Sequence, residues 1–251
     1  MVNAITGRDS FFYDKFIIEL NRANEVKIIV SFLRESGVQL IIKDLKKQAM
    51  KGTDIKILTS NYLNITEPSA LYLLKDELGK MVNLRLYETE EISFHPKAYF
   101  FKSENKEVLF VGSSNLSYSA FHSGVEWNYR LIDKNDPEAY KEFETDFNDL
   151  FYNNSVKVDK KYLRQYASNW KKPGILKTVD NQKKETIPKE KPKPRGAQIE
   201  ALYELNKARE EGVSEGMVAA ATGVGKTYLA AFDSVDYEKI LFVAHRKEIL
   251  K

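Results

Sequence analysis

Apolar positions along the first two thirds of the chain follow two different periods. Short runs rich in Val, Ile, Leu and Phe favour strands, whereas the segments between them repeat apolar residues every three or four positions, as amphipathic helices do. The predicted strands are 26–32, 54–60, 82–87, 94–101, 108–112 and 126–132, and the predicted helices are 10–23, 38–50, 68–78, 116–121, 137–152 and 159–170. Strands that alternate with helices predict an α/β fold whose sheet is covered on both faces.

A basic, proline-rich segment divides the chain. Residues 173–196 hold seven Lys or Arg, three Asp or Glu and four of the seven prolines, with little apolar content to form a core. We therefore predict a first domain over residues 1–172, a flexible linker over 173–195 and a second unit over 196–251. The charge of the linker suits non-specific contact with nucleic acid, and a plain solvated tether explains it equally well.

The second unit follows a shorter pattern. It predicts a helix over 197–210, a strand over 217–220, a glycine loop, a helix from Lys226 and a strand over 239–244. One strand, helix and strand do not complete an α/β domain, so we expect a truncated lobe that belongs to a longer protein.

Composition excludes several classes of function. The chain has no cysteine, which excludes disulfides, a thiol nucleophile and cysteine-based zinc sites. It has no run of about 18 apolar residues and no apolar N-terminal signal region, so we expect a cytoplasmic protein that does not enter a membrane. The three histidines are His95, His122 and His245.

One predicted hairpin gathers polar side chains of a particular kind. If residues 103–106 form its turn, paired positions sum to about 209, which places Lys97 opposite Gly112 and His95 opposite Ser114. Asn115 follows directly. An imidazole, an ammonium, a carboxamide and a hydroxyl beside a glycine form a plausible pocket for a phosphate diester, with the imidazole as nucleophile.

These residues resemble a known motif. His95-Pro96-Lys97 and Gly112-Ser113-Ser114-Asn115 are similar to the HxK…GSxN motif of the phospholipase D superfamily, and Glu126 stands where its nucleases carry a glutamate. The resemblance implies a phospholipase D-like mixed β-sheet flanked by helices. It also implies that His95 forms a covalent phosphohistidine, that Lys97 and Asn115 stabilise the phosphorane, and that Glu126 orients the imidazole. The candidate catalytic residues are His95, Lys97, Ser113, Asn115 and Glu126.

The chain departs from that superfamily in two respects. Lys102 stands where the motif has an aspartate, which concerns local packing more than chemistry. The mechanism also needs two histidine motifs, whereas His122 has Gly124, not a lysine, two positions later. We therefore expect a homodimer whose axis passes through the active site, with no metal and no other cofactor for the nuclease reaction.

A second motif lies in the second unit. The sequence from Ala220 to Thr227 matches a Walker A loop, with alanine in place of the first glycine. Backbone N–H groups of such a loop bind phosphates, the lysine reaches the β and γ oxygens, and the threonine holds Mg²⁺. The candidate nucleotide-binding residues here are Thr222, Gly223, Gly225, Lys226 and Thr227.

The surroundings of that loop resemble superfamily 2 helicases. Gln198 lies in a segment similar to their adenine-reading Q motif, and residues 242–246 are similar to motif Ia, which touches the nucleic-acid backbone. The resemblance implies ATP and Mg²⁺ as cofactors of the full-length protein, with a truncated RecA-like lobe over 196–251. No DExx sequence follows Lys226, so we expect this chain not to hydrolyse ATP efficiently.

These features favour a metal-independent endonuclease acting on DNA, or else RNA, that is coupled to a helicase in restriction or DNA repair. One alternative is a metal-dependent nuclease of the PD-(D/E)xK kind, using Asp44, Asp54 and Lys56 or Asp14, Glu25 and Lys27. A second is a non-catalytic module that positions DNA for the helicase, and a third is a lipid-directed phospholipase, which lacks an amphipathic membrane-surface segment here.

Overall fold

The computed structural model describes residues 3–8, 11–89, 92–171, 194–221, 223–235 and 237–243. The chain separates into two compact units, Met1–Leu163 and Arg164–Lys251, which are described separately below. This division falls inside helix α6 (Lys160–Asn169). Most of the predicted linker 173–195 lies outside the described residues, and so do the motif residues Thr222 and His245.

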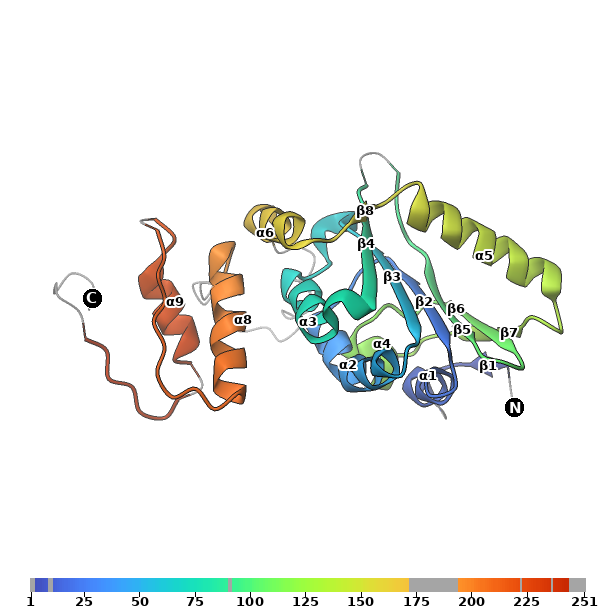
Figure 1. The fold of residues 1–251 in the computed structure, drawn as a ribbon, viewed down its shortest axis with the longest axis horizontal. Coiled ribbons are helices and arrows are strands. Elements are labelled where there is room, and N and C mark those ends of the chain that lie inside the picture. The colour runs from blue at the N-terminus through green and yellow to red at the C-terminus, as the bar shows by residue number, and fades with distance from the viewer. Residues whose placement is uncertain are drawn as a thin grey trace, which may run out of the picture. The chain divides into compact units, whose positions relative to one another are not determined.

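The first unit is built on one mixed eight-stranded sheet with the order β1-β7-β6-β5-β2-β3-β4-β8 (Figure 1). Strands β2, β3 and β4 run parallel to one another, and the remaining pairs are antiparallel. The strands are β1 (Ala4–Ile5), β2 (Glu25–Val30), β3 (Asp54–Ser60), β4 (Val82–Tyr87), β5 (Lys97–Lys102), β6 (Glu107–Gly112), β7 (Asn128–Ile132) and β8 (Val156–Lys157).

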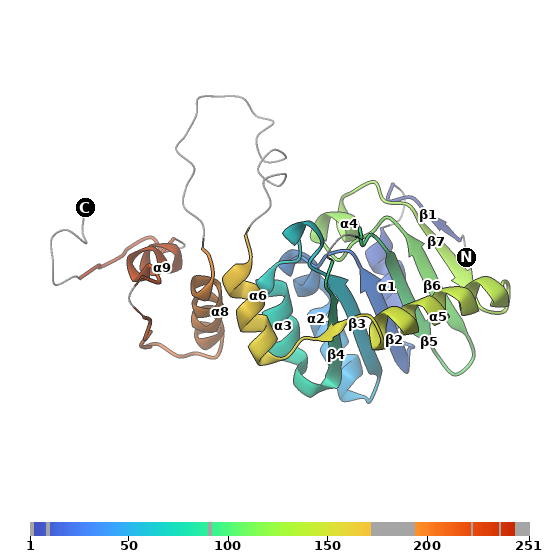
Figure 2. The ribbon, with the colours of Figure 1, turned by 90° about the horizontal axis from the view of Figure 1, so that it is seen from above.

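Helices cover both faces of the sheet, as predicted. Helix α5 (Pro137–Tyr152) covers one face, and the other face carries α1 (Phe12–Leu20), α2 (Glu35–Met50), α3 (Pro68–Leu78) and α4 (Tyr118–His122), as Figures 1 and 2 show. Two short 3₁₀ turns, η1 (Tyr62–Asn64) and η2 (Gly79–Met81), complete the described elements of this unit.

Aromatic side chains form much of the core on the α1 face. Phe12 packs against Tyr99, Phe110 and Phe121 with ring centroids 4.9–5.4 Å apart, and Phe16 joins the same group. On the α5 face, Phe100, Leu109 and Phe147 belong to a separate cluster. Because both faces are packed, the ends of the strands are where polar groups can gather.

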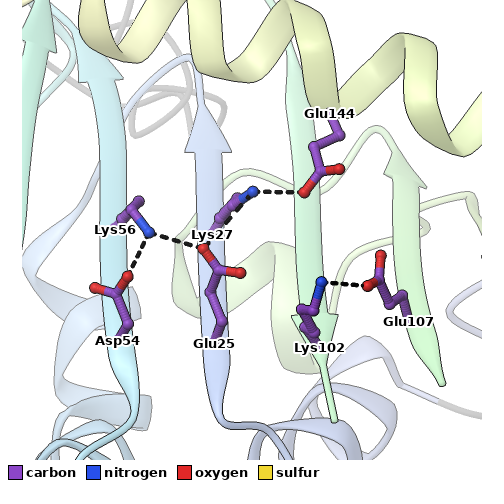
Figure 3. A network of polar contacts seen from close by, with 7 residues as sticks. All are labelled: Glu25, Lys27, Asp54, Lys56, Lys102, Glu107 and Glu144. Atoms are coloured by element: carbon purple, nitrogen blue, oxygen red, sulfur yellow. Dashed lines mark hydrogen bonds and ion pairs between the residues drawn. The ribbon is translucent and has the colours of Figure 1, made fainter. Parts of the chain in front are cut away.

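At one end of the sheet a network of ion pairs spans four strands and α5 (Figure 3). Lys27 of β2 is 6% exposed, and its Nζ lies 2.6 Å from Glu144 of α5 and 3.7 Å from Glu25. Lys56 of β3 contacts Glu25 at 2.7 Å and also Asp54. Each buried ammonium is therefore paired with carboxylates, which offsets the free energy lost when the charge leaves water.

Lys102, which stands in the place of the motif aspartate, belongs to this network. Its ammonium lies 2.5 Å from Glu107 across the β5–β6 turn. Lys102 is thus at the opposite end of β5 from Lys97, and its ion pair lies away from the candidate site.

The sequence pattern predicts the elements of the first unit well. Strands β3 and β4 and helices α3 and α5 have the predicted bounds, and the other predicted elements differ from the observed ones by a few residues. The two-residue edge strands β1 and β8 were not predicted, because two residues carry no recognisable alternation. In the described part of the chain, no helix has both the length and the apolar character to span a membrane.

The second unit contains α8 (Ala197–Glu210) and α9 (Lys226–Asp233), whose bounds agree with prediction. The two helices pack together, and Arg209 of α8 forms an ion pair with Asp233 of α9. The predicted strands are wrong in the described part of residues 217–220 and 239–244, which is extended or irregular. A strand needs a hydrogen-bonded neighbour, and these segments have none there; Met217 and Leu241 are 93% and 90% exposed.

Candidate active site

The β5–β6 hairpin has the predicted register, with Ala98 opposite Val111 and Lys102 opposite Glu107. Strand β5 begins at Lys97, so His95 lies just before the strand and not within it. His95 is exposed while Lys97 is 6% exposed, which places the imidazole at the surface directly above the ammonium.

The Lys97 ammonium is held by neutral groups. Its Nζ donates to Ser31 Oγ (2.9 Å) and to the His95 carbonyl oxygen (2.9 Å), and it lies 2.7 Å from His95 Nδ1. Among the described residues, no carboxylate oxygen lies within ion-pair distance of this ammonium. Burial lowers the pKa of Lys97 to about 8, although the charge of Glu126 acts in the opposite direction.

The same surroundings act on His95. Desolvation, and secondarily the positive charge of Lys97, lower the pKa of His95 below its usual 6.5. The imidazole is therefore neutral at neutral pH, which is the form that a nucleophile requires.

The loop after β6 is fixed from below through Ser114. Tyr99 Oη donates to the Ser114 carbonyl (2.8 Å), and Asn128 Nδ2 donates to Ser114 Oγ (2.8 Å). Asn115, which is 7% exposed, accepts a hydrogen bond on Oδ1 from the Phe32 amide (3.2 Å). With Oδ1 engaged as acceptor, the donor side of this carboxamide is its Nδ2 group, which suits an anion.

Gly112 allows β6 and β7 to approach closely at the site. A Cβ atom at this position would lie 2.1 Å from the Trp127 carbonyl oxygen and 2.5 Å from Asn128 Oδ1. Next to it, Ser113 donates its amide hydrogen to the same Trp127 oxygen (2.9 Å), and its hydroxyl donates to Glu126. The glycine of the motif is therefore required by backbone packing.

The structure places His95 in contact with Lys97 and Ser113 in contact with Glu126, and it joins Asn115 to the Phe32 amide, next to the Ser31 hydroxyl that Lys97 contacts. Glu126 is close enough to raise the pKa of Lys97, but its carboxylate accepts from Ser113, and no contact with His95 occurs among the described residues. The role of Glu126 in orienting the imidazole stays a prediction.

Four residues that hold the site were not predicted from the sequence. Ser31 and the Phe32 amide lie at the end of β2, and Tyr99 and Asn128 lie beneath the loop after β6. Ser31 follows a run of apolar strand residues, which is the one sequence signal that could have indicated a strand-end position.

The predicted phosphate loop of the second unit is partly described. Gly223 and Gly225 have φ values of 88° and 82°, which favour glycine, and α9 begins at Lys226. Lys226 Nζ donates to the carbonyls of Ala220 and Ala221 (2.9 and 3.0 Å), and Thr227 is exposed. Gln198 Nε2 donates to the Val224 carbonyl at 2.8 Å, so Gln198 contacts the loop itself. A glycine-rich loop that leads into the N-terminus of a helix at a lysine is the arrangement that binds phosphate groups in other proteins.

Several solved structures are similar to this chain. Nuc from Salmonella typhimurium, described as a phospholipase D family member, is 19% identical, with a TM-score of 0.46 over 59% of this chain and 90% of that one. NucT from Helicobacter pylori is 18% identical, with a TM-score of 0.47 over 62% and 97%. Polyphosphate kinase from Porphyromonas gingivalis is 15% identical, with a TM-score of 0.52 over 84% and 29%, which indicates a shared fold. A search of curated proteins found no match.

Two protein families match the sequence itself. The family described as "Type III restriction enzyme, res subunit" matches residues 191–251, which is a helicase-type fragment. The family described as "Cardiolipin synthase, PLD-like domain" matches residues 16–151, more than half of the chain, and includes every candidate catalytic residue. The fold, the motif and this match agree, and the chain belongs to the phospholipase D-like domain family.

Proposed function

We propose that this chain is a metal-independent phosphodiester hydrolase that cuts DNA through a phosphohistidine intermediate and works as a homodimer. The observation that supports this most directly is the buried Lys97 ammonium beneath the exposed His95 imidazole, held by neutral partners. A cation that has been desolvated and not neutralised attracts the non-bridging oxygens of a phosphate strongly.

The proposed reaction has two displacements at phosphorus. His95 Nε2 of one subunit, in its neutral form, attacks and a P–N bond forms, while the second subunit's His95, which enters the step as an imidazolium, protonates the leaving oxygen as its bond to phosphorus breaks. The second histidine then takes a proton from water, whose oxygen attacks phosphorus and releases His95. Lys97 and Asn115 bind the non-bridging oxygens in both steps.

The hydrogen bond on His95 Nδ1 bears on this mechanism. While the Lys97 ammonium donates to Nδ1, a neutral imidazole carries its proton on Nε2, which then cannot attack. An attacking Nε2 needs a proton on Nδ1 and an acceptor for it, which is the role proposed for Glu126. The site of a single chain therefore requires a rearrangement, and a second subunit supplies both the second imidazole and a second Glu126.

The second unit supports nucleic acid as the substrate. The match to a restriction-enzyme subunit and the phosphate loop around Lys226 suit an ATP-dependent partner in the full-length protein, in restriction or DNA repair. Gly223, Gly225 and Lys226 would hold the phosphates, Thr222 and Thr227 would lie beside them with Mg²⁺ at Thr227, and Gln198 would meet the adenine. The contact between Gln198 and the Val224 carbonyl would then have to break.

The metal-dependent alternative has less support from the geometry. Asp54 and Lys56, and likewise Glu25 and Lys27, contact one another in the ion-pair network of Figure 3. In the described ranges, no group of three or more His, Asp or Glu side chains is placed to hold a metal.

The test is cleavage of a labelled DNA oligonucleotide by the full chain in excess EDTA. We expect wild-type protein to cut, His95→Ala to lose activity by at least about a thousandfold, and His122→Ala, which changes a histidine outside the site, to cut normally. Acid-quenched digests of wild type should contain a labelled covalent adduct on the His95 peptide. Full inhibition by EDTA would favour the metal-dependent reading, and DNA binding without cleavage would favour the non-catalytic one.

A further inference from the structure

The end of β2 touches the candidate site through a hydroxyl. Ser31 is fully buried, and its Oγ accepts a hydrogen bond from Lys97 Nζ (2.9 Å) while donating to the Pro96 carbonyl (3.2 Å). This hydroxyl thus contacts the ammonium and, through Pro96, the backbone between His95 and Lys97. Its donor and one of its acceptor positions are both in use.

The next residue holds the other group that would bind phosphate. The Phe32 amide donates to Asn115 Oδ1 (3.2 Å), so two consecutive residues of one strand end contact both Lys97 and Asn115. This segment is itself fixed, because Ser60 at the end of β3 donates its hydroxyl to the Ser31 carbonyl (2.8 Å). The strand end therefore acts as a rigid reference for two side chains from β5 and from the loop after β6.

We propose that Ser31 is a positioning residue for Lys97, holding the ammonium in line with Asn115 so that both face the same phosphate. This inference rests on the proposed phosphodiesterase function. The ammonium has three N–H donors, and all three are used within the chain, by Ser31, the His95 carbonyl and His95 Nδ1. When a phosphate oxygen replaces the contact with Nδ1, the Ser31 and carbonyl contacts keep the ammonium in place.

The charges around Lys97 make this role measurable. The groups that face it are His95 from its own segment, Glu126 from the loop before β7 and the Ser31 hydroxyl from β2. Of these, Ser31 stabilises the charged form without carrying a charge, since a hydrogen bond from an ammonium to a hydroxyl favours protonation. Loss of the hydroxyl should therefore leave the Lys97 ammonium less firmly positioned, and it should also lower the pKa of Lys97.

The test compares Ser31→Ala with a matched control in the full chain. Thr53→Val also removes a buried hydroxyl that donates to a backbone carbonyl, that of Ala23 at 3.1 Å, but Thr53 lies at the other end of β3 and touches no site residue. Ser31→Cys provides a second variant that keeps most of the volume and replaces the oxygen by a weak acceptor, in case the alanine variant does not fold.

We expect Ser31→Ala and Ser31→Cys to lower kcat by about 10- to 100-fold with little change in KM, and to move the alkaline loss of activity to lower pH. Thr53→Val should keep wild-type kcat and pH profile. Equal kcat losses in Ser31→Ala and Thr53→Val, or an unshifted alkaline limb in both Ser31 variants, would overturn the proposal.

A readout without catalysis separates this proposal from the proposed function. The pH dependence of acetic anhydride labelling at Lys97, read by mass spectrometry of its peptide, reports the titration of the ammonium directly. If wild-type protein cuts no DNA, the phosphodiesterase proposal fails. The Ser31 contact is still tested, because an unchanged labelling curve in folded Ser31→Ala would overturn it and a shift to lower pH would support it.

Discussion

Two lysines of the same sheet are equally buried, but one has charged partners and the other has neutral partners. Lys27 and Lys97 are each 6% exposed, and β2 contributes to the surroundings of both. Lys27 lies between Glu144 and Glu25, whereas Lys97 is held by a hydroxyl, a carbonyl and an imidazole. The protein thus pairs one buried ammonium with carboxylates and gives only neutral partners to the other, for which we propose a role in binding phosphate.

The comparison extends to the second unit. Lys226 is bonded to two backbone carbonyls, and no carboxylate lies within ion-pair distance among the residues that the structure describes. Neutral oxygen partners hold an ammonium in position and can be exchanged for phosphate oxygens at little electrostatic cost. Lys97 and Lys226 share this pattern of neutral partners.

The largest expected difference between the two lysines is in the rate of DNA cleavage after each is replaced by methionine. Lys97→Met should lower kcat/KM for DNA cleavage by about 10²–10³-fold, because it removes a donor that stabilises charge in the transition state. Lys27→Met should cut DNA at close to the wild-type rate under conditions where it is folded. Steady-state cleavage in EDTA measures both, and equal losses would remove the distinction.

The pH profile should depend on both site residues, His95 and Lys97. Above about pH 8 the loss of activity should steepen by about tenfold per pH unit, as Lys97 loses its proton, and the acidic limb should lie below pH 6.5 because the pKa of His95 is lowered. Lys27→Met should have the same profile. A plateau that continues to pH 10 would show that the charge of Lys97 is not required.

The two methionine substitutions should change the free energy of unfolding in opposite directions. Lys27→Met should lower the free energy of unfolding by about 1–2 kcal/mol, because it leaves Glu144 and Glu25 without their shared cation; these carboxylates are 30% and 24% exposed, which limits the loss. Urea denaturation followed by circular dichroism measures it. The double variant Lys27→Met/Glu144→Gln should recover part of the loss, and no recovery would mean that packing alone is responsible.

Lys97→Met should instead raise the free energy of unfolding at pH 7, by about 1 kcal/mol, since it removes a buried ammonium with no carboxylate in contact. In wild type the lysine pKa is about 8 when folded and 10.5 when unfolded, so the unfolded chain binds more protons between those values and wild-type stability rises with pH. The advantage of the variant should therefore shrink between pH 8 and 10.5. A constant or negative difference over that range would contradict this.

The sequence predicts the site residues of one hairpin better than those that come from distant parts of the chain. The register of β5 and β6 follows from a short polar turn, and it correctly places Lys97 beside the loop that carries Asn115. The contact between Ser31 and Lys97 joins positions 66 residues apart. No local pattern reports such a pairing, because it depends on which strands become neighbours in the sheet.

The same limit explains the errors. The alternation along residues 94–101 does not reveal that the sheet is packed on both sides there; Tyr99 is fully buried and contacts the site only through its hydroxyl. The strands predicted at 217–220 and 239–244 have good composition but no neighbour to pair with in the described residues. In both cases the decisive information lies in tertiary contacts.

The position of β2 between β3 and β5 has a consequence for how the molecule is made. Pairing with β3 closes the shorter loop, whereas pairing with β5 has to wait until η1, α3, η2, β4 and β5 have also been synthesised and the ends of a longer loop meet. Under the proposed function, a polypeptide emerging from the ribosome cannot cut a phosphodiester before β5 has paired with β2, and the return of cleavage during refolding would report that this pairing has formed.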